Sequence, residues 1–196
     1  MKKVFVILSV LCIFTLSACA HIEPVNLLHF TDNLNDSYGY GRVSLSDYMI
    51  KDGEYTLLLK EGATEFLLTL SENEEGKIKS IRFTVGKTDD KGKFKAISDE
   101  AAKLYYENAA HILSAFSMFD YDECAGILSQ LIPRSGSDFS KTGELTAQWN
   151  NFSLAYYSNG LCCQLYATDN YLEETESTSK PVSRPAYGQT AHIRED

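Results

Sequence analysis

The residues best suited to covalent chemistry are two adjacent cysteines, Cys162 and Cys163, and one histidine, His111, remote from both ends of the chain. A cysteine thiolate activated by a histidine base is a common enzymatic nucleophile. The spacing of these residues gives no support for such a pair. His111 falls beside the apolar stripe of an expected helix, where a partly exposed surface histidine is the ordinary outcome. We therefore predict no catalytic residue.

Other signatures of catalysis or cofactor binding are missing from the sequence. It contains no GxxxxGK[ST] phosphate loop, no GxGxxG opening a helix and no GxSxG elbow. Ser177 and Lys180 match SxxK by letter, but they lie in a polar segment where no pocket could shift their pKa values. We expect no cofactor.

Metal-binding patterns are equally weak. Residues 32–36 faintly resemble a calcium loop, but Leu34 occupies a position where an oxygen ligand is required. The cysteines and histidines lack the spacing of zinc ligands. We expect a solvated polar turn at 32–36 and no metal.

The composition excludes several classes of partner. The chain has 196 residues, 44% hydrophobic and 23% charged, with a formal net charge of -9. These values are typical of one compact globular domain. An acidic chain is poorly suited to nucleic acid, whose phosphates need a surface of lysine and arginine. It is also poorly suited to polybasic adhesion to anionic lipid.

Residues 1–18 have the pattern of a secretory signal peptide. Lys2 and Lys3 precede an apolar run from Val4 to Leu16. The run is shorter than the roughly 20 apolar residues of a spanning helix. Removal of this leader with its two lysines takes the net charge from -9 to -11.

The four residues at the end of this leader, Leu16-Ser17-Ala18-Cys19, resemble the lipobox of bacterial lipoproteins. The resemblance implies recognition of Leu16, Ser17, Ala18 and Cys19 by signal peptidase II, with a diacylglyceryl group on the Cys19 thiol. The chain would then be lipid-anchored in the cell membrane and face outside the cytoplasm, since two or more acyl chains anchor a protein stably. An ordinary signal peptide with a chance cysteine, or a short membrane helix, is the alternative. In overall organisation the chain also resembles small lipoproteins of Firmicutes, a likeness that carries no functional residue beyond the lipobox.

The rest of the chain divides into three parts. We expect a lipidated tether at 19–31, a single folded domain at 32–172 and a tail at 173–196. The tail has almost no large aliphatic residues, so it cannot bury enough apolar surface to offset its ordering entropy, and we expect it to be disordered.

Within the domain, hydrophobic periodicity predicts strands, then two helices, then strands. Strands are expected at 54–60, 64–71 and 77–85, with a short one near 94–97. Ser98 and the two acids after it begin a helix. Asp120 with Glu123 has the capping-box spacing of a second helix, which Pro133 ends. Strands return at 145–149, 152–158 and 161–168. This order predicts an α+β fold with an antiparallel sheet and two consecutive helices on one face.

The last hairpin carries the candidate binding face. A two-residue turn at 159–160 would pair Tyr157 with Cys162. Alternation along the strands places Tyr157, Gln164 and Tyr166 on the outer face of the sheet. Exposed tyrosines beside amides stack on sugars or dock a protein. The alternative is that a second layer, such as the N-terminal segment, covers this face.

The mature domain keeps three cysteines. Cys163 falls on the inner face of its strand, and Cys124 on the apolar stripe of the second helix, so the two would meet across the core. We predict a disulfide between Cys124 and Cys163, with Cys162 free. A Cys124–Cys162 bond, a vicinal bond and buried reduced thiols remain alternatives.

Together these features predict a membrane-anchored extracytoplasmic lipoprotein whose domain is a non-enzymatic binding or interaction module. Its partners would be the membrane, through Cys19, and an envelope protein or glycan, but no nucleic acid. A small extracytoplasmic hydrolase or hydrolase inhibitor is one alternative, and a structural envelope-assembly lipoprotein is the other.

Overall fold

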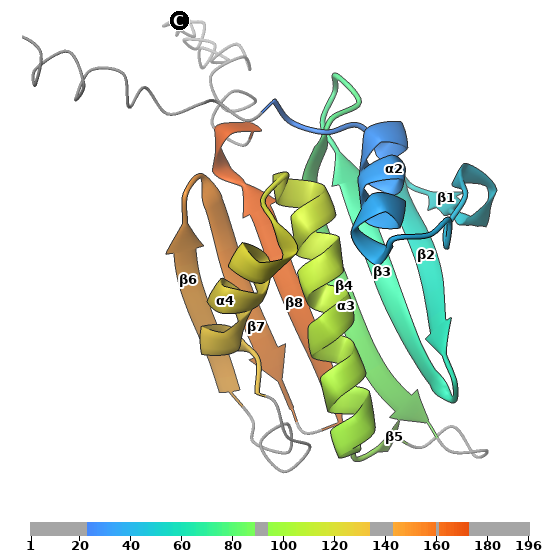
Figure 1. Ribbon diagram of the computed structural model, residues 1–196, viewed down its shortest axis with the longest axis vertical. Helices are drawn as coiled ribbons and strands as arrows, with labels where there is room; N and C mark the ends of the chain where they lie inside the picture. The colour runs from blue at the N-terminus through green and yellow to red at the C-terminus, as the bar shows by residue number, and fades with distance from the viewer. Residues whose placement is uncertain (1–22, 89–93, 134–142, 160, 173–196) are drawn as a thin grey trace, which may run out of the picture.

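One antiparallel sheet with helices on a single face makes up the fold (Figure 1). The computed structural model describes residues 23–88, 94–133, 143–159 and 161–172. Its elements are α2 (Leu27–Tyr38), the 3-10 turn η1 (Leu45–Asp47), β1 (Met49–Lys51), β2 (Glu54–Glu61), β3 (Thr64–Glu72), β4 (Ile78–Thr88), β5 (Phe94–Lys95), α3 (Asp99–Ser117), α4 (Tyr121–Leu131), β6 (Gly143–Trp149), β7 (Phe152–Ser158) and β8 (Cys162–Asp169).

The sheet has the strand order β1-β2-β3-β4-β8-β7-β6, and β5 pairs with β4 beside this path. Every pair is antiparallel. Two meanders are joined at the centre, where Phe83 of β4 lies opposite Leu165 of β8. The predicted α+β class and antiparallel sheet are therefore confirmed.

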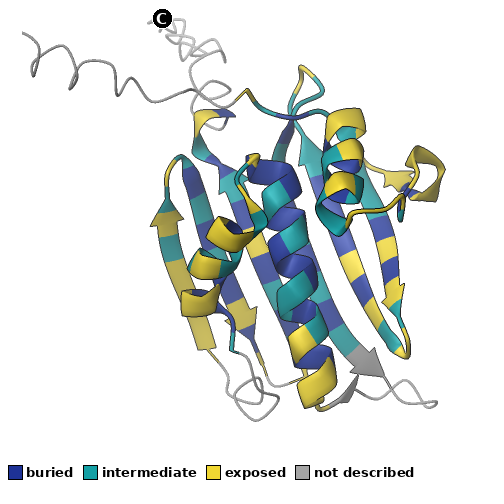
Figure 2. Ribbon diagram, in the orientation of Figure 1, coloured by how far each residue is buried: buried dark blue, intermediate teal, exposed yellow. Residues whose placement is uncertain are grey.

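The inner face of the sheet forms the core with α3. Figure 2 shows buried residues alternating with more exposed ones along the strands, as expected of a sheet covered on one side. Tyr105 of α3 is completely buried and lies parallel to Phe83, with ring centroids 4.9 Å apart. Its hydroxyl donates a hydrogen bond to the Phe83 carbonyl at 2.9 Å. This contact fixes α3 across the junction of the two meanders.

The two predicted helices begin and end where their capping residues indicate. The Ser98 side chain accepts from the Ala101 N–H at 3.2 Å at the start of α3. Asp120 is the N-cap of α4 but makes no capping hydrogen bond through its side chain, so the capping-box detail was wrong. The helix stops at Leu131, shortly before Pro133.

The sequence interpretation missed α2. The sequence predicts a tether up to residue 31 and a polar turn at 32–36, whereas residues 27–38 form a helix capped by Asn26, whose side chain accepts from the His29 N–H at 2.9 Å. Leu34 is buried in the core. The Val25 carbonyl accepts from Ile78 N–H at 2.8 Å. The folded domain therefore begins before residue 32, because one apolar edge of this polar segment packs on α3.

The register of the last hairpin also differs from the expectation. Tyr157 lies opposite Gln164 and not opposite Cys162, a shift of two residues. The cause is a longer turn, in which the Asn159 side chain accepts from the N–H groups of Leu161 and Cys162 at 3.0 and 2.8 Å. An even shift leaves each side chain on its predicted face.

Candidate functional site

The three residues of the candidate binding face lie together on the side of the sheet away from the helices. Tyr157 and Gln164 are directly opposite each other on β7 and β8. Tyr166 donates a hydrogen bond to the Gln164 side-chain carbonyl at 2.7 Å. The exposed fractions of Tyr157 and Tyr166 are 39% and 38%. Gln164 therefore holds Tyr166 in place, and both tyrosine rings are accessible to a partner.

This surface continues across the sheet. Gln164 lies opposite Thr84 of β4, and Thr84 lies opposite Leu67 of β3. Leu58 of β2 follows in the same row. Both leucines are exposed. We call Leu58, Leu67, Thr84, Tyr157, Gln164 and Tyr166 the outer row.

Among the described residues, no helix or strand covers the outer row. Helices α2, α3 and α4 lie on the opposite side of the sheet (Figure 1). Arg82 lies opposite Tyr166 on the same face, 3.7 Å from Glu54, and both charged side chains are more than two-fifths exposed. The outer face therefore combines exposed apolar side chains with hydroxyl, amide and charged groups.

His111 belongs to a polar cluster on the helix side. Its ring lies between Tyr38 and Tyr121, with centroid distances of 4.3 and 4.5 Å. Its Nδ1 lies 2.8 Å from the Ser37 hydroxyl. Burial is the main cause that lowers the pKa of His111, and the positive charge of Arg42 lowers it further. Two tyrosine rings contact the imidazole in tilted arrangements, and its hydrogen-bond partner is Ser37 and not a cysteine.

Arg42 extends this cluster to β2. Its guanidinium is 2.6 Å from the Glu61 carboxylate and donates to the side-chain oxygen of Asn108 at 3.2 Å. It also lies 4.5 Å from the centre of the Tyr38 ring. Asn108 in turn donates to Glu61 at 3.0 Å. Arg42, Asn108 and Glu61 therefore bind one another, and their contacts hold the segment after α2 against α3 and β2.

The pocket beside this cluster does not hold the histidine. Its volume is 240 Å³, and it is lined by Lys103, Tyr106, Glu107 and Tyr121. Neither His111 nor Ser37 lines it. This geometry gives no support to a hydrolase built on His111.

The predicted Cys124–Cys163 disulfide is absent: Cys124, Cys162 and Cys163 are free thiols. Cys124 Sγ lies 3.6 Å from the Ser117 hydroxyl at the end of α3, whereas Cys163 Sγ lies 3.4 Å from the Ser158 hydroxyl. The two thiols thus have separate surroundings. Burial raises the pKa of Cys124 to about 11 and also raises the pKa of Cys163, and Cys162 is half-buried.

The acidic residues at 32–36 lie on α2. Their spacing follows a helix whose Leu34 points into the core, so they do not form a loop around an ion. Within the described ranges, no group of three or more histidine, cysteine, aspartate or glutamate residues is arranged to hold a metal.

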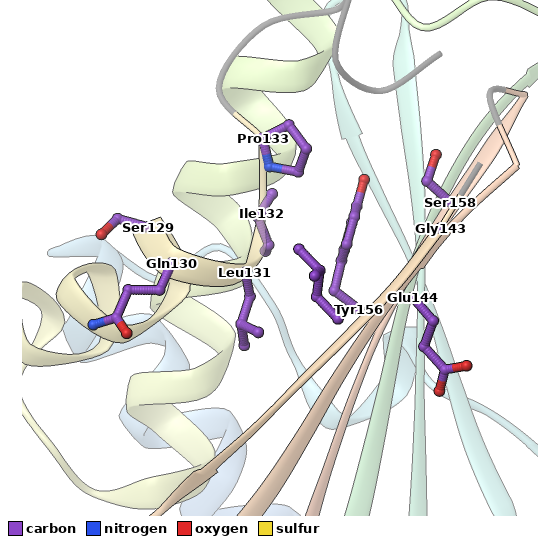
Figure 3. Close-up of a pocket in the computed structure, with 10 residues that line it drawn as sticks. Ser129, Gln130, Leu131, Ile132, Pro133, Gly143, Glu144, Tyr156 and Ser158 are labelled. Atoms are coloured by element: carbon purple, nitrogen blue, oxygen red, sulfur yellow. The ribbon is translucent and has the colours of Figure 1, made fainter. Parts of the chain in front are cut away.

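Sequence reasoning did not anticipate a pocket of 480 Å³ between the end of α4 and the strands β6 and β7 (Figure 3). Leu131, Ile132 and Pro133 line one side of the pocket, and Leu145 and Tyr156 line the other. Ser129, Gln130, Gly143, Glu144 and Ser158 complete the lining. No motif marks it, because it arises from two elements brought together only by folding.

The lipobox residues Leu16 to Cys19 and the tail at 173–196 lie outside the described residues. In the part of the chain that is described, no helix has the length and apolarity needed to cross a membrane. Comparisons of the chain with protein-family models, with curated proteins and with solved structures found no match.

Proposed function

We propose that this chain is a lipid-anchored extracytoplasmic interaction module that binds another envelope component through the outer face of its sheet. The anchor is the diacylglyceryl group that the lipobox resemblance implies on Cys19. The binding surface is the outer row. No catalytic step is part of this function.

The observation that supports this proposal is the one-sided sheet. Helices bury the inner face, while Leu58, Leu67, Tyr157 and Tyr166 stay exposed on the other. Apolar side chains grouped on an otherwise polar surface are typical of interaction sites. Tyrosine suits such a site because it offers a large ring and a polar tip with few rotatable bonds.

The anchor is tested by mass spectrometry of the N-terminal peptide from membrane-purified protein. We expect a chain beginning at Cys19 and carrying the diacylglyceryl mass. In the Cys19→Ser variant the protein is expected to lose this mass and leave the membrane fraction. A wild-type chain that keeps Met1, or lacks the lipid, would refute the anchor.

The binding surface is tested by photo-crosslinking in cells. A photoreactive amino acid replaces Tyr157 on the outer face or, as a control, Lys103, whose side chain is 75% exposed on α3. We expect one discrete crosslinked species from position 157 only, and its loss when Leu67→Lys is added. The same species from both positions, or none from position 157, would refute this surface.

A further inference from the structure

The pocket between α4 and β6 lies at the edge of the sheet. β6 is the terminal strand of the order, and among the described residues it pairs with β7 and with no other strand. Its first four residues, Gly143 to Thr146, are exposed. Every second residue of an edge strand directs its N–H and C=O groups away from the sheet, so β6 offers a row of hydrogen-bonding groups to another strand.

The pocket would receive the side chains of an added strand. Leu145 lies opposite Tyr156, so its side chain is on the inner face, toward α4. Although it faces the core side, Leu145 is 49% exposed, because α4 stops at Leu131. A strand paired to β6 places its own inner-face residues beside Leu145, near the apolar end of α4.

The charge beside the pocket indicates the charge of the occupant. Glu144 is the one charged residue among the described residues that line the pocket, and it is exposed. The chain as a whole has a formal net charge of -9. A positively charged segment is therefore complementary, and an acidic one is repelled.

From the edge strand, the apolar pocket and the exposed Glu144 carboxylate beside it, we propose that β6 and the end of α4 bind an extended, positively charged segment of a partner protein by strand addition. Main-chain hydrogen bonds to β6 would give affinity, and an apolar side chain at every second position would fill the pocket. This site lies on a different surface from the outer row, so a test of one does not decide the other.

The probe is a capped seven-residue peptide in which valine and lysine alternate, titrated against the full chain in detergent. Trp149, the chain's single tryptophan, lies on β6 with its ring tilted against Phe119 at a centroid distance of 4.7 Å, so its fluorescence reports binding at this strand. Hydrogen exchange of the β6 amides provides the second readout. We expect saturable binding and slower exchange, whereas peptides with glutamate for lysine, or with a central proline, bind at least about tenfold more weakly.

Matched variants test the pocket. Leu145→Ser is expected to weaken the peptide about tenfold, because one apolar contact is lost. Leu28→Ser is the control, since Leu28 is also 49% exposed but lies on α2. Glu144→Gln should reduce the difference in affinity between the lysine and glutamate peptides, because it removes the carboxylate charge at the pocket.

Three results would overturn the proposal. The first is equal affinity of the chain for all three peptides, or equal affinity of the Leu145→Ser and Leu28→Ser variants for the lysine peptide. The second is binding without slower exchange in β6, which indicates only non-specific ionic attraction. The third is a concentration-dependent dimer that Leu145→Ser dissociates, which assigns the edge to a second copy of this chain.

Discussion

Removing the Arg42 side chain tests a polar group that contacts α2, α3 and β2. Only 12% of this side chain is exposed, and its ion-pair partner Glu61 is 25% exposed. Arg42 also reaches Asn108 and the ring of Tyr38. Arg42→Ala therefore leaves a largely buried carboxylate and an amide oxygen without the cation, while solvent can reach Glu61 only in part.

The cost follows from these contacts. A hydrogen bond to a charged group contributes about 1.5–3 kcal/mol, and a half-exposed cation–π contact about 0.5–1 kcal/mol. Since Glu61 recovers some hydration in the variant, we expect Arg42→Ala to lower the free energy of unfolding by about 2–3 kcal/mol. With a urea dependence of about 2 kcal/mol per molar, the midpoint falls by about 1 M or slightly more.

The assay is urea unfolding followed by circular dichroism, with Arg82→Ala as the matched control. Arg82 is 42% exposed and lies 3.7 Å from the equally open Glu54, so its loss should cost less than about 1 kcal/mol. Arg42→Lys is expected to fall between wild type and Arg42→Ala, because lysine keeps the charge but loses the planar fork. Equal costs for Arg42→Ala and Arg82→Ala, within about 0.5 kcal/mol, would refute the reasoning.

Three further predictions concern other buried groups. Because its folded-state pKa lies below the ordinary 6.5, His111 takes up its proton more readily when unfolded. Stability should therefore fall as the pH drops through this range, and His111→Phe, which keeps the ring, should flatten that part of the pH profile; an unchanged profile contradicts this. Alkylation of the native protein at pH 8 should modify Cys162 well before the buried Cys124 and Cys163, which peptide mass spectrometry would measure. Equal alkylation rates for the three thiols would contradict the burial of Cys124 and Cys163. Tyr105→Phe should cost about 1 kcal/mol in urea unfolding, and no measurable cost would contradict the buried hydrogen bond.

The strands other than β1, and the helices α3 and α4, were predictable because their patterns are local. Short apolar runs mark β2 and β3, and alternation marks β4 and β7. Ser98 and Pro133 mark helix ends by their own chemistry. Helix α2 was missed because Asn, Asp and Thr are poor helix formers, and only burial of Phe30 and Leu34 against the rest of the fold overrides that preference.

The candidate sites also differ in whether a local sequence pattern could predict them. Period-two alternation sufficed to place Tyr157, Gln164 and Tyr166 on one face, even though the register was wrong by two residues. The predicted Cys124–Cys163 bond failed because residue spacing gives the face of an element but not the distance between two elements. The pocket beside Leu145 depends on where α4 ends over β6, and no local pattern contains that information.

The sequence by itself determined the class of fold, the order of the elements from β2 to β8, the acidic character of the chain and the lipobox resemblance at Cys19. Each of these depends on composition or on residues close together in the chain. The tertiary structure decided which face of the sheet stays open, which thiols stay apart and where the edge of β6 meets the end of α4. Those outcomes depend on contacts between segments up to 88 residues apart, such as β4 with β8 and α2 with α3, and packing is set by the whole core at once.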